Sequence, residues 1–371
     1  MPIFDQGYQH WDGRLSGHAF RWLAITRQGV NTMARLKAVR WVIILAWGPA
    51  LLLTVFLSIW GLIEQKSELL TPFLNILQAL PEEIRDGPKA YRKTIWTIAY
   101  YNFYALEIYF ALLITAIVGP NLISQDLRFN AIPLYFSKPL RRIDYFIGKL
   151  GVVATFIGAV TILPAVLAYV MGVSFSLEWS VITDTWPILV GAIGHGLIVC
   201  ISSGTLILAI SSLSKNSRYV AALWVGFWLV SGAASGILLQ TVREPWCELI
   251  AYQRNIDNVR NAMLDTQGAR EKIVALVESS EKKMREAMNS AGPFGGFGPF
   301  GGRRRPMPPP RPRRFDVDPG DDPSIVANRR IPFTPDREKA PWIWSAGVLF
   351  GLFGASAWVL TTRVKSLDRL R

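Results

Sequence analysis

Long apolar runs dominate the hydropathy pattern of this chain. Six of them are long enough to cross a hydrocarbon layer of about 30 Å, which takes about 20 helical residues. They lie approximately at residues 41–63, 95–119, 150–173, 186–213, 219–241 and 342–362. The pattern predicts an all-α membrane protein with six transmembrane helices.

Composition agrees with membrane insertion. The chain has 371 residues, of which 51% are hydrophobic and only 18% are charged, and its mean hydropathy is +0.26. These values lie outside the usual soluble range. The formal net charge of +13 raises the alternative of a nucleic-acid partner. Most basic residues, however, flank the apolar runs or lie in one segment rich in proline and glycine, so membrane topology explains them better and no nucleic-acid partner is expected.

Basic residues also predict the orientation of the chain in the membrane. They cluster before the first run, between the second and third, between the fourth and fifth, and after the sixth. With six spans, these four segments fall on one side, and lysine and arginine favour the cytoplasmic side. The loop at 174–185 has no lysine or arginine, whereas the loop at 64–94 has five and disagrees. The prediction is a multi-pass protein of the cytoplasmic (inner) membrane with both termini in the cytoplasm.

Residues 1–40 are predicted to form a cytoplasmic N-terminal segment with an interfacial helix. Apolar residues recur there at helical spacing, and arginines fall on the other side of the same helical wheel. The apolar set is Trp22, Ile25, Gly29, Met33 and Leu36, and the basic set is Arg21, Arg27 and Arg35. This pattern suits a helix that lies on the inner leaflet. An amphipathic helix packed on a soluble partner is the alternative.

The connection at residues 242–341 is the one large polar region, and six spans place it outside the cytoplasm. Residues 41–241 before it hold the first five spans, and residues 342–371 hold the sixth span and a cytoplasmic tail. Helical spacing of apolar residues predicts helix across 247–290, with a break near the sequence DTQG. Residues 292–323 have too much glycine and proline for a packed core, which predicts a partly disordered loop. A strip that binds anionic lipid or polymer is the alternative.

Catalytic motifs are absent from the sequence. There is no GxxxxGK[ST] phosphate loop, no HExxH and no GxSxG, and the three histidines are scattered. The two cysteines have no metal-ligand spacing. We therefore expect no enzyme activity, no metal and no cofactor bound by this chain itself.

Two ionisable residues lie well inside predicted spans. Glu107 is about twelve residues into the second span and His195 about nine into the fourth, so both are expected near the middle of the membrane. An intramembrane carboxyl is costly unless it faces water or a partner, which makes both residues candidates for a translocation path. The alternatives are a Glu107 carboxyl that hydrogen-bonds a neighbouring helix and a His195 that packs in a seam of glycines.

The segment at 120–149 returns to polar composition between two apolar runs. Its charged start and apolar continuation consist of Asp126, Arg128, Leu134, Tyr135 and Phe136. Pro133 and Pro139 divide it into short elements, because proline cannot continue a helix through its interior. We expect a short helix that projects from the membrane and fits a partner's groove. A solvated loop whose charges only set the topology is the alternative.

This segment resembles the signature of type-2 ABC exporter permeases, in which a charged run, an apolar run, a Ser-x-Pro element, an arginine and a Gly-Lys pair precede the third span. The matching positions are Asp126, Arg128, Leu134, Ser137 with Pro139, Arg141 or Arg142, and Gly148 with Lys149. The interfacial helix, the six spans and the large outer connection also match. The sequence departs from the family pattern at Asn130 and Ala131, where a Gly-Thr pair is common.

The resemblance implies a permease subunit without a nucleotide site of its own. In that family the loop after the second span is a coupling helix that docks on a separate ATPase subunit, which binds ATP and magnesium. The implied contacts in this chain are Asp126, Arg128, Leu134 and Phe136. The implied partners are the ATPase, a second copy of this permease or a paralogous one, and membrane lipids.

Two other functions fit the same sequence. One is a membrane scaffold that anchors an envelope assembly through the outer loop. The other is an ion-coupled transporter centred on Glu107, which would need no ATPase. Copurification of an ATPase distinguishes the exporter from both.

Overall fold

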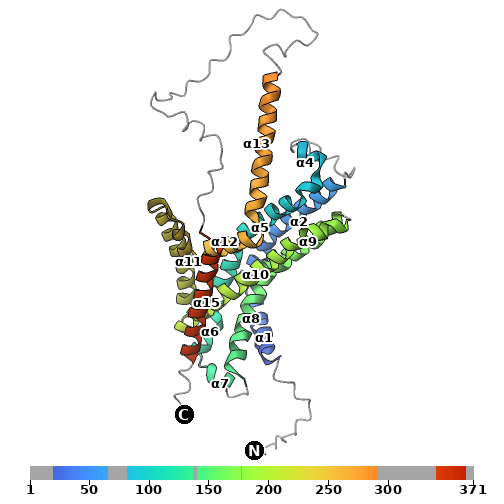
Figure 1. Cartoon of the computed structure of the whole chain (residues 1–371). Coiled ribbons are helices and arrows are strands. Elements are labelled where there is room, and N and C mark those ends of the chain that lie inside the picture. Colours follow the sequence, from blue (N-terminus) through green and yellow to red (C-terminus); the bar gives the residue numbers. More distant parts are fainter. Residues whose placement is uncertain (1–19, 66–81, 137–139, 177, 291–339, 365–371) are drawn as a thin grey trace, which may run out of the picture.

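The computed structural model describes residues 20–65, 82–136, 140–176, 178–290 and 340–364, and these residues form helices joined by short turns (Figure 1). Six helical segments are long and apolar enough to cross a membrane. They are α2 (Lys37–Glu64), α5 with α6 (Pro88–Val118 and Pro120–Arg128), α8 with α9 (Arg142–Val160 and Ile162–Ser176), α10 (Trp179–Leu213), α11 (Ser217–Thr241) and α15 (Trp342–Val364). The prediction of an all-α membrane protein with six spans is confirmed.

Several spans begin earlier in the chain than the apolar runs indicate, and α5 and α10 show why. α5 begins at Pro88, where a proline is tolerated because the first N–H groups of a helix have no partner within the helix. α10 begins at Trp179, so most of the loop expected at 174–185 is helical. The added turns carry polar residues that have partners within the protein, as described below, and hydropathy alone therefore places these ends too late.

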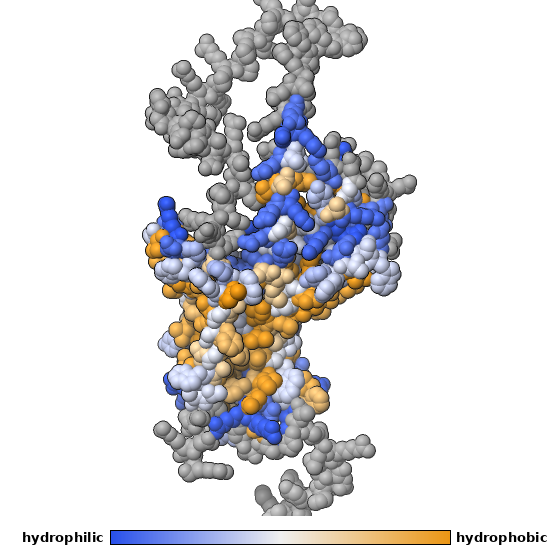
Figure 2. Space-filling view, in the orientation of Figure 1, coloured by the Kyte–Doolittle hydropathy of each residue, from blue (hydrophilic) through white to orange (hydrophobic). Residues whose placement is uncertain are grey.

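Buried apolar side chains form two clusters along the bundle. One lies toward α7 (Ile132–Phe136) and joins the first part of α2 to the second parts of α5 and α10. The other lies toward α13 (Thr266–Ser290) and joins the remaining parts of α2, α5 and α10 to α9. Figure 2 shows an apolar band across the middle of the molecule and hydrophilic residues at both ends. We refer to these ends as the α7 end and the α13 end.

The chain between α11 and α13 returns among the spans. It forms the short helix η3 (Pro245–Ile250) and then α12 (Tyr252–Met263), whose Ile256 and Val259 are buried in the cluster toward the α7 end. The Tyr252 hydroxyl lies 3.0 Å from the Ser202 hydroxyl and 2.8 Å from the Ser203 hydroxyl of α10. Hydropathy does not predict this return because α12 is strongly polar on its other side.

Helix α13 extends away from the bundle (Figure 1). A turn at Asp265, where φ is 50°, separates it from α12. Its Leu276 is buried in the cluster toward the α13 end, and Lys283 forms an ion pair with Glu83 of α4 (Glu82–Asp86). The low-complexity segment predicted at 292–323 lies outside the described residues.

Candidate coupling site

A sharp turn joins α6 to α7. The amide of Phe129 donates to the carbonyl of Gln125, the amide of Ala131 donates to that of Asp126, and Asn130 has a positive φ of 51°. Glycine and asparagine are the residues that adopt this left-handed conformation most readily. Asn130, which occupies the place where the resembled family commonly has glycine, adopts this conformation.

Ser211 of α10 fixes the start of α6. Its hydroxyl oxygen accepts hydrogen bonds from the amides of Ser124 and Ile123 at 3.0 and 3.3 Å. The same hydroxyl donates to the carbonyl of Pro120 at 3.0 Å. The first amides of a helix have no partner within the helix, so a side chain that accepts from them stabilises the helix start. The break between α5 and α6 is therefore attached to α10.

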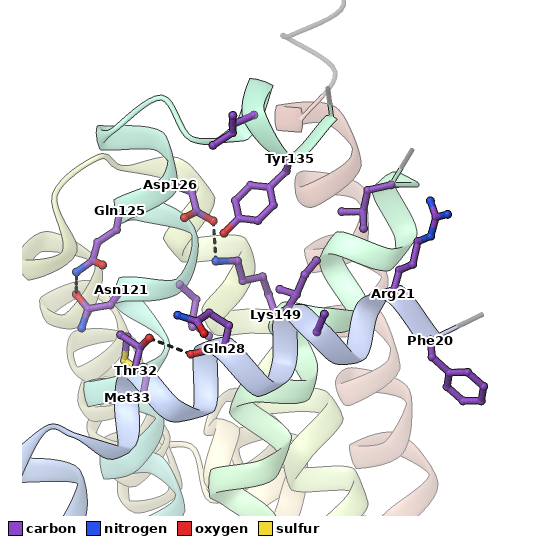
Figure 3. A pocket seen from close by; sticks show the side chains of 16 residues that line it. Phe20, Arg21, Gln28, Thr32, Met33, Asn121, Gln125, Asp126, Tyr135 and Lys149 are labelled. Carbon is purple, nitrogen blue, oxygen red and sulfur yellow. Dashed lines mark hydrogen bonds and ion pairs between the residues drawn. The ribbon is translucent and has the colours of Figure 1, made fainter. Parts of the chain in front are cut away.

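An ion pair joins the two ends of the segment. Lys149 Nζ of α8 lies 2.6 Å from Asp126 Oδ2 (Figure 3). The Tyr145 hydroxyl donates to the same oxygen at 2.7 Å. The Lys149 ammonium also lies 5.7 Å from the centre of the Tyr135 ring. Burial, and then the negative charge of Asp126, raise the pKa of Tyr135, so this phenol stays neutral beside the ammonium. α6, α7 and α8 thus meet around one buried charge pair.

Replacing Lys149 by methionine keeps the length of the side chain and leaves the Asp126 carboxylate without its cation. We expect the free energy of unfolding to fall by about 1.5–3 kcal/mol, the range for a hydrogen bond to a charged group. Thermal unfolding in nanodiscs measures this loss. The double variant Asp126→Asn, Lys149→Met should recover part of it, because no buried charge is then unpaired. If the double variant lost as much free energy of unfolding as the two single variants added together, the result would contradict the pairing.

An exposed group of side chains lies on the turn and on α7. Phe129 is 72% exposed and Leu134 is 70% exposed. Arg128 is also exposed, and its guanidinium carbon lies 5.6 Å from the centre of the Phe129 ring. We call Arg128, Phe129 and Leu134 the α6–α7 patch. Phe129 was not singled out from the sequence, because an aromatic residue beside a charged run is typical of many loops.

The other predicted contacts have different positions. Asp126 points toward Lys149 (Figure 3), and only 14% of its side chain is exposed, so it holds the segment together from within. Phe136 is the last residue of α7, and its side chain lies outside the described part of the chain, as do Ser137 and Pro139. The roles of these four residues toward a partner stay predictions.

The N-terminal helix α1 (Arg21–Ala34) crosses α8 next to this site. The Thr26 hydroxyl donates to the Gly148 carbonyl at 2.9 Å. A Cβ atom on Gly148 would lie 2.8 Å from Ile25 Cβ, and one on Gly151 would lie 2.6 Å from Thr26 Oγ1, so both glycines are required for this close approach. The apolar side of α1 predicted from the sequence therefore packs on α8, which links α1 to the helix that carries Lys149.

Glu107 and His195 are both buried, on α5 and α10 respectively. The Tyr104 ring packs edge-on against the His195 ring at 4.6 Å between centres. Among the described residues, neither carboxylate oxygen of Glu107 has a hydrogen-bond partner. The structure shows no hydrogen bond between Glu107 and His195 in the part that it describes. Burying a carboxyl within the membrane without a hydrogen-bond partner lowers the stability of the folded protein. The role of Glu107 in a translocation path stays a prediction.

At the α13 end, Arg92 of α5 binds three carboxylates. Its guanidinium lies 2.7 Å from Glu64 of α2, 2.9 Å from Asp184 of α10 and 3.4 Å from Glu178. Arg92 and Glu64 have only 2% and 3% of their side chains exposed. Lys89 lies 2.6 Å from Glu178, and this hydrogen bond lowers the pKa of the Glu178 carboxyl. These charges join the ends of three spans, and they give two of the five basic residues of the loop at 64–94 carboxylate partners within the protein.

Comparison with known proteins identifies the family. A family model described as ABC-2 family transporter protein matches residues 45–284, which is more than half of the chain. This range holds four of the six spans and most of a fifth, α2, together with the α6–α7 segment, η3 and α12. Neither the curated proteins nor the solved structures contain a match. The chain belongs to the ABC-2 family of transporter proteins, as a multi-pass membrane subunit.

Proposed function

We propose that this chain is the permease subunit of an ATP-driven exporter and that its α6–α7 patch docks on a separate ATPase subunit. The observation that carries the proposal is the combination of two exposed apolar side chains, Phe129 and Leu134, with a basic residue on a short element that is firmly attached to the spans. Exposed aromatic and aliphatic side chains beside an arginine are typical of protein interfaces. ATP and magnesium would bind to the partner, since this sequence has no phosphate loop.

The attachments of the patch supply a route for coupling. α6 continues α5 after Gly119, Ser211 ties its start to α10, and Lys149 ties its end to α8. A force on the patch therefore acts on three spans together. Closure of an ATPase dimer would shift the equilibrium between two arrangements of these helices. Alternating access consists of such a shift between two arrangements.

The proposed orientation places the α7 end and both termini in the cytoplasm, with the protein in the inner membrane and exporting outward. Basic residues around α1 and at the end of α15 support it. A second permease, either a copy or a paralogue, would complete the path. α11 and α15 have room for it, because a Cβ atom on Gly232, Gly236, Gly347 or Gly351 would meet no described atom within 4 Å. Lipid would cover whatever surface the second permease leaves.

Photo-cross-linking tests the docking proposal in native membranes. A benzophenone amino acid at Leu134 is expected to capture a protein that carries a phosphate loop, identified by mass spectrometry. The matched control is the same probe at Val277, which is 46% exposed on α13 at the other end of the molecule. Capture of the same ATPase from Val277, or of none from Leu134, would contradict the proposal.

A second candidate function rests on Glu107. Its buried carboxylate without a described partner is a feature of ion-coupled transporters as well as of substrate paths. An ion-coupled transporter would respond to a proton gradient across proteoliposomes without nucleotide. The proposed exporter would be inactive under that condition and would require the ATPase subunit with ATP.

A further inference from the structure

A cavity of about 850 Å³ lies between α1 and the α6–α7 segment. Figure 3 shows it bounded by Arg21, Gln28 and Thr32 of α1, by Asn121 and Gln125 of α6, and by Tyr135 of α7. Cavities that hold whole small molecules measure roughly 300–1,000 Å³, so this one is large enough for more than a single side chain.

The lining has both apolar and polar parts. Ile25, Met33 and Leu122 supply aliphatic surface, and Gln28, Thr32 and Gln125 supply hydrogen-bonding groups. Such a combination fits an amphiphile, because each part of the ligand finds a matching environment. A purely polar metabolite would leave the aliphatic part of the cavity in contact with water.

The charge of the lining is positive. Among the described lining residues, Arg21 and Lys149 are cations and Asp126 is the one carboxylate. That carboxylate lies 2.6 Å from the Lys149 ammonium, and Arg21 adds a second cation to the lining. The same end of the molecule carries Arg27, Arg35 and Lys37, which strengthens the attraction for an anion.

The position of the cavity is that of a membrane surface. α1 leads into α2, the first span, and crosses α8, which belongs to the third. Phe20, at the edge of the cavity, is 73% exposed, and Leu23 on α1 is 49% exposed. Exposed apolar side chains next to arginines are typical of a helix at the boundary between headgroups and acyl chains.

We propose that this cavity binds an anionic phospholipid of the adjacent leaflet. The phosphate lies near Arg21 and Gln28, and acyl chain covers Ile25, Met33 and Leu122. The bound lipid then bridges α1 and the α6–α7 segment, which couples the lipid composition of the membrane to the position of the proposed ATPase-docking patch. Lipid binding itself does not require the ATPase, so the two proposals fail independently.

Native mass spectrometry of the purified full chain tests the proposal, with dioleoylphosphatidylglycerol or dioleoylphosphatidylcholine added at equal concentration. We expect a retained phosphatidylglycerol adduct and a weaker phosphatidylcholine adduct. Gln28→Trp places a bulky indole in the cavity and should weaken the adduct. Asn31→Trp is the matched control, because Asn31 is an exposed residue of α1 that does not line the cavity. Equal phosphatidylglycerol retention by the two variants would overturn the proposal.

A milder pair of variants tests the charge. Arg21→Gln should weaken phosphatidylglycerol binding roughly fivefold, the effect of about one positive charge near an anionic surface, whereas Arg27→Gln should change it less because Arg27 does not line the cavity. Equal effects of the two substitutions, or equal binding of both lipids to the wild type, would overturn the assignment to an anionic lipid. If Gln28→Trp kept the lipid adduct but lost a copurifying ATPase, a protein segment would be the occupant and the proposal would be wrong.

Discussion

Replacing Arg92 by methionine is expected to lower the free energy of unfolding by about 3–5 kcal/mol, the usual loss when one partner of a buried ion pair is removed. Arg92 is 2% exposed and lies 2.7 Å from Glu64, whose side chain is 3% exposed. Without the guanidinium, the one hydrogen bond that the Glu64 carboxylate keeps among the described residues is donated by Trp60 Nε1 at 2.7 Å. Thermal unfolding of the purified protein in nanodiscs measures the change.

Two further variants separate this effect from a general loss of surface charge. Lys89→Met removes an ion pair with Glu178 in which both side chains are well exposed, at 56% and 41%, and should leave the unfolding midpoint nearly unchanged. Glu64→Gln combined with Arg92→Met should be more stable than Arg92→Met alone, because the buried charge is removed together with its partner. If Lys89→Met were as damaging as Arg92→Met, the buried pair would not be the source of the stability.

Replacing Leu134 by aspartate is expected to weaken binding of the ATPase subunit by roughly thirtyfold or more, which corresponds to the loss of an interface hot spot. A carboxylate in place of an interface leucine must lose its hydration, and a surface that fits leucine gives it no hydrogen-bond partner in return. The affinity of the subunit captured from Leu134 for the chain in nanodiscs measures the effect. Phe129→Asp should act in the same direction, since Phe129 belongs to the same patch and is 72% exposed.

The control for these substitutions is Val277→Asp, an exposed apolar residue at the α13 end. It introduces the same charge far from the proposed interface and should leave the affinity unchanged. Unfolding midpoints equal to that of the wild type would show that all three variants are folded. Unchanged affinity for both Leu134→Asp and Phe129→Asp would mean that the α6–α7 patch does not contact the ATPase.

Hydropathy was sufficient to predict the spans because each apolar run is longer than a soluble helix requires and the runs are separated by charged turns. It failed at the ends of α5 and α10, where polar residues such as Asp184 continue the helix because Arg92 provides their partner. It also failed at α12, which is polar overall yet buries Ile256 and Val259 between spans. Tertiary partners, which a single sequence does not reveal, decide these cases.

The candidate site, like the fold, could be predicted from the sequence only in part. The charges and prolines of 120–149 indicated a docking element, and the resemblance singled out Asp126 and Lys149, but their 2.6 Å contact with each other could not be read from positions twenty-three residues apart. Phe129 carried no sequence signal, although its 72% exposure makes it a central part of the patch. Exposure of one side chain and burial of its neighbour depend on how a short helix is attached, and Ser211 and Lys149 attach this one from other spans.

Electron cryo-microscopy of the assembled complex tests the central claim most directly. The complex would be purified with the captured ATPase subunit and held with a non-hydrolysable ATP analogue. The proposal predicts that Phe129 and Leu134 are buried against the ATPase while the Asp126–Lys149 pair remains closed behind them. An ATPase bound elsewhere, with both side chains still open to solvent, would contradict the account.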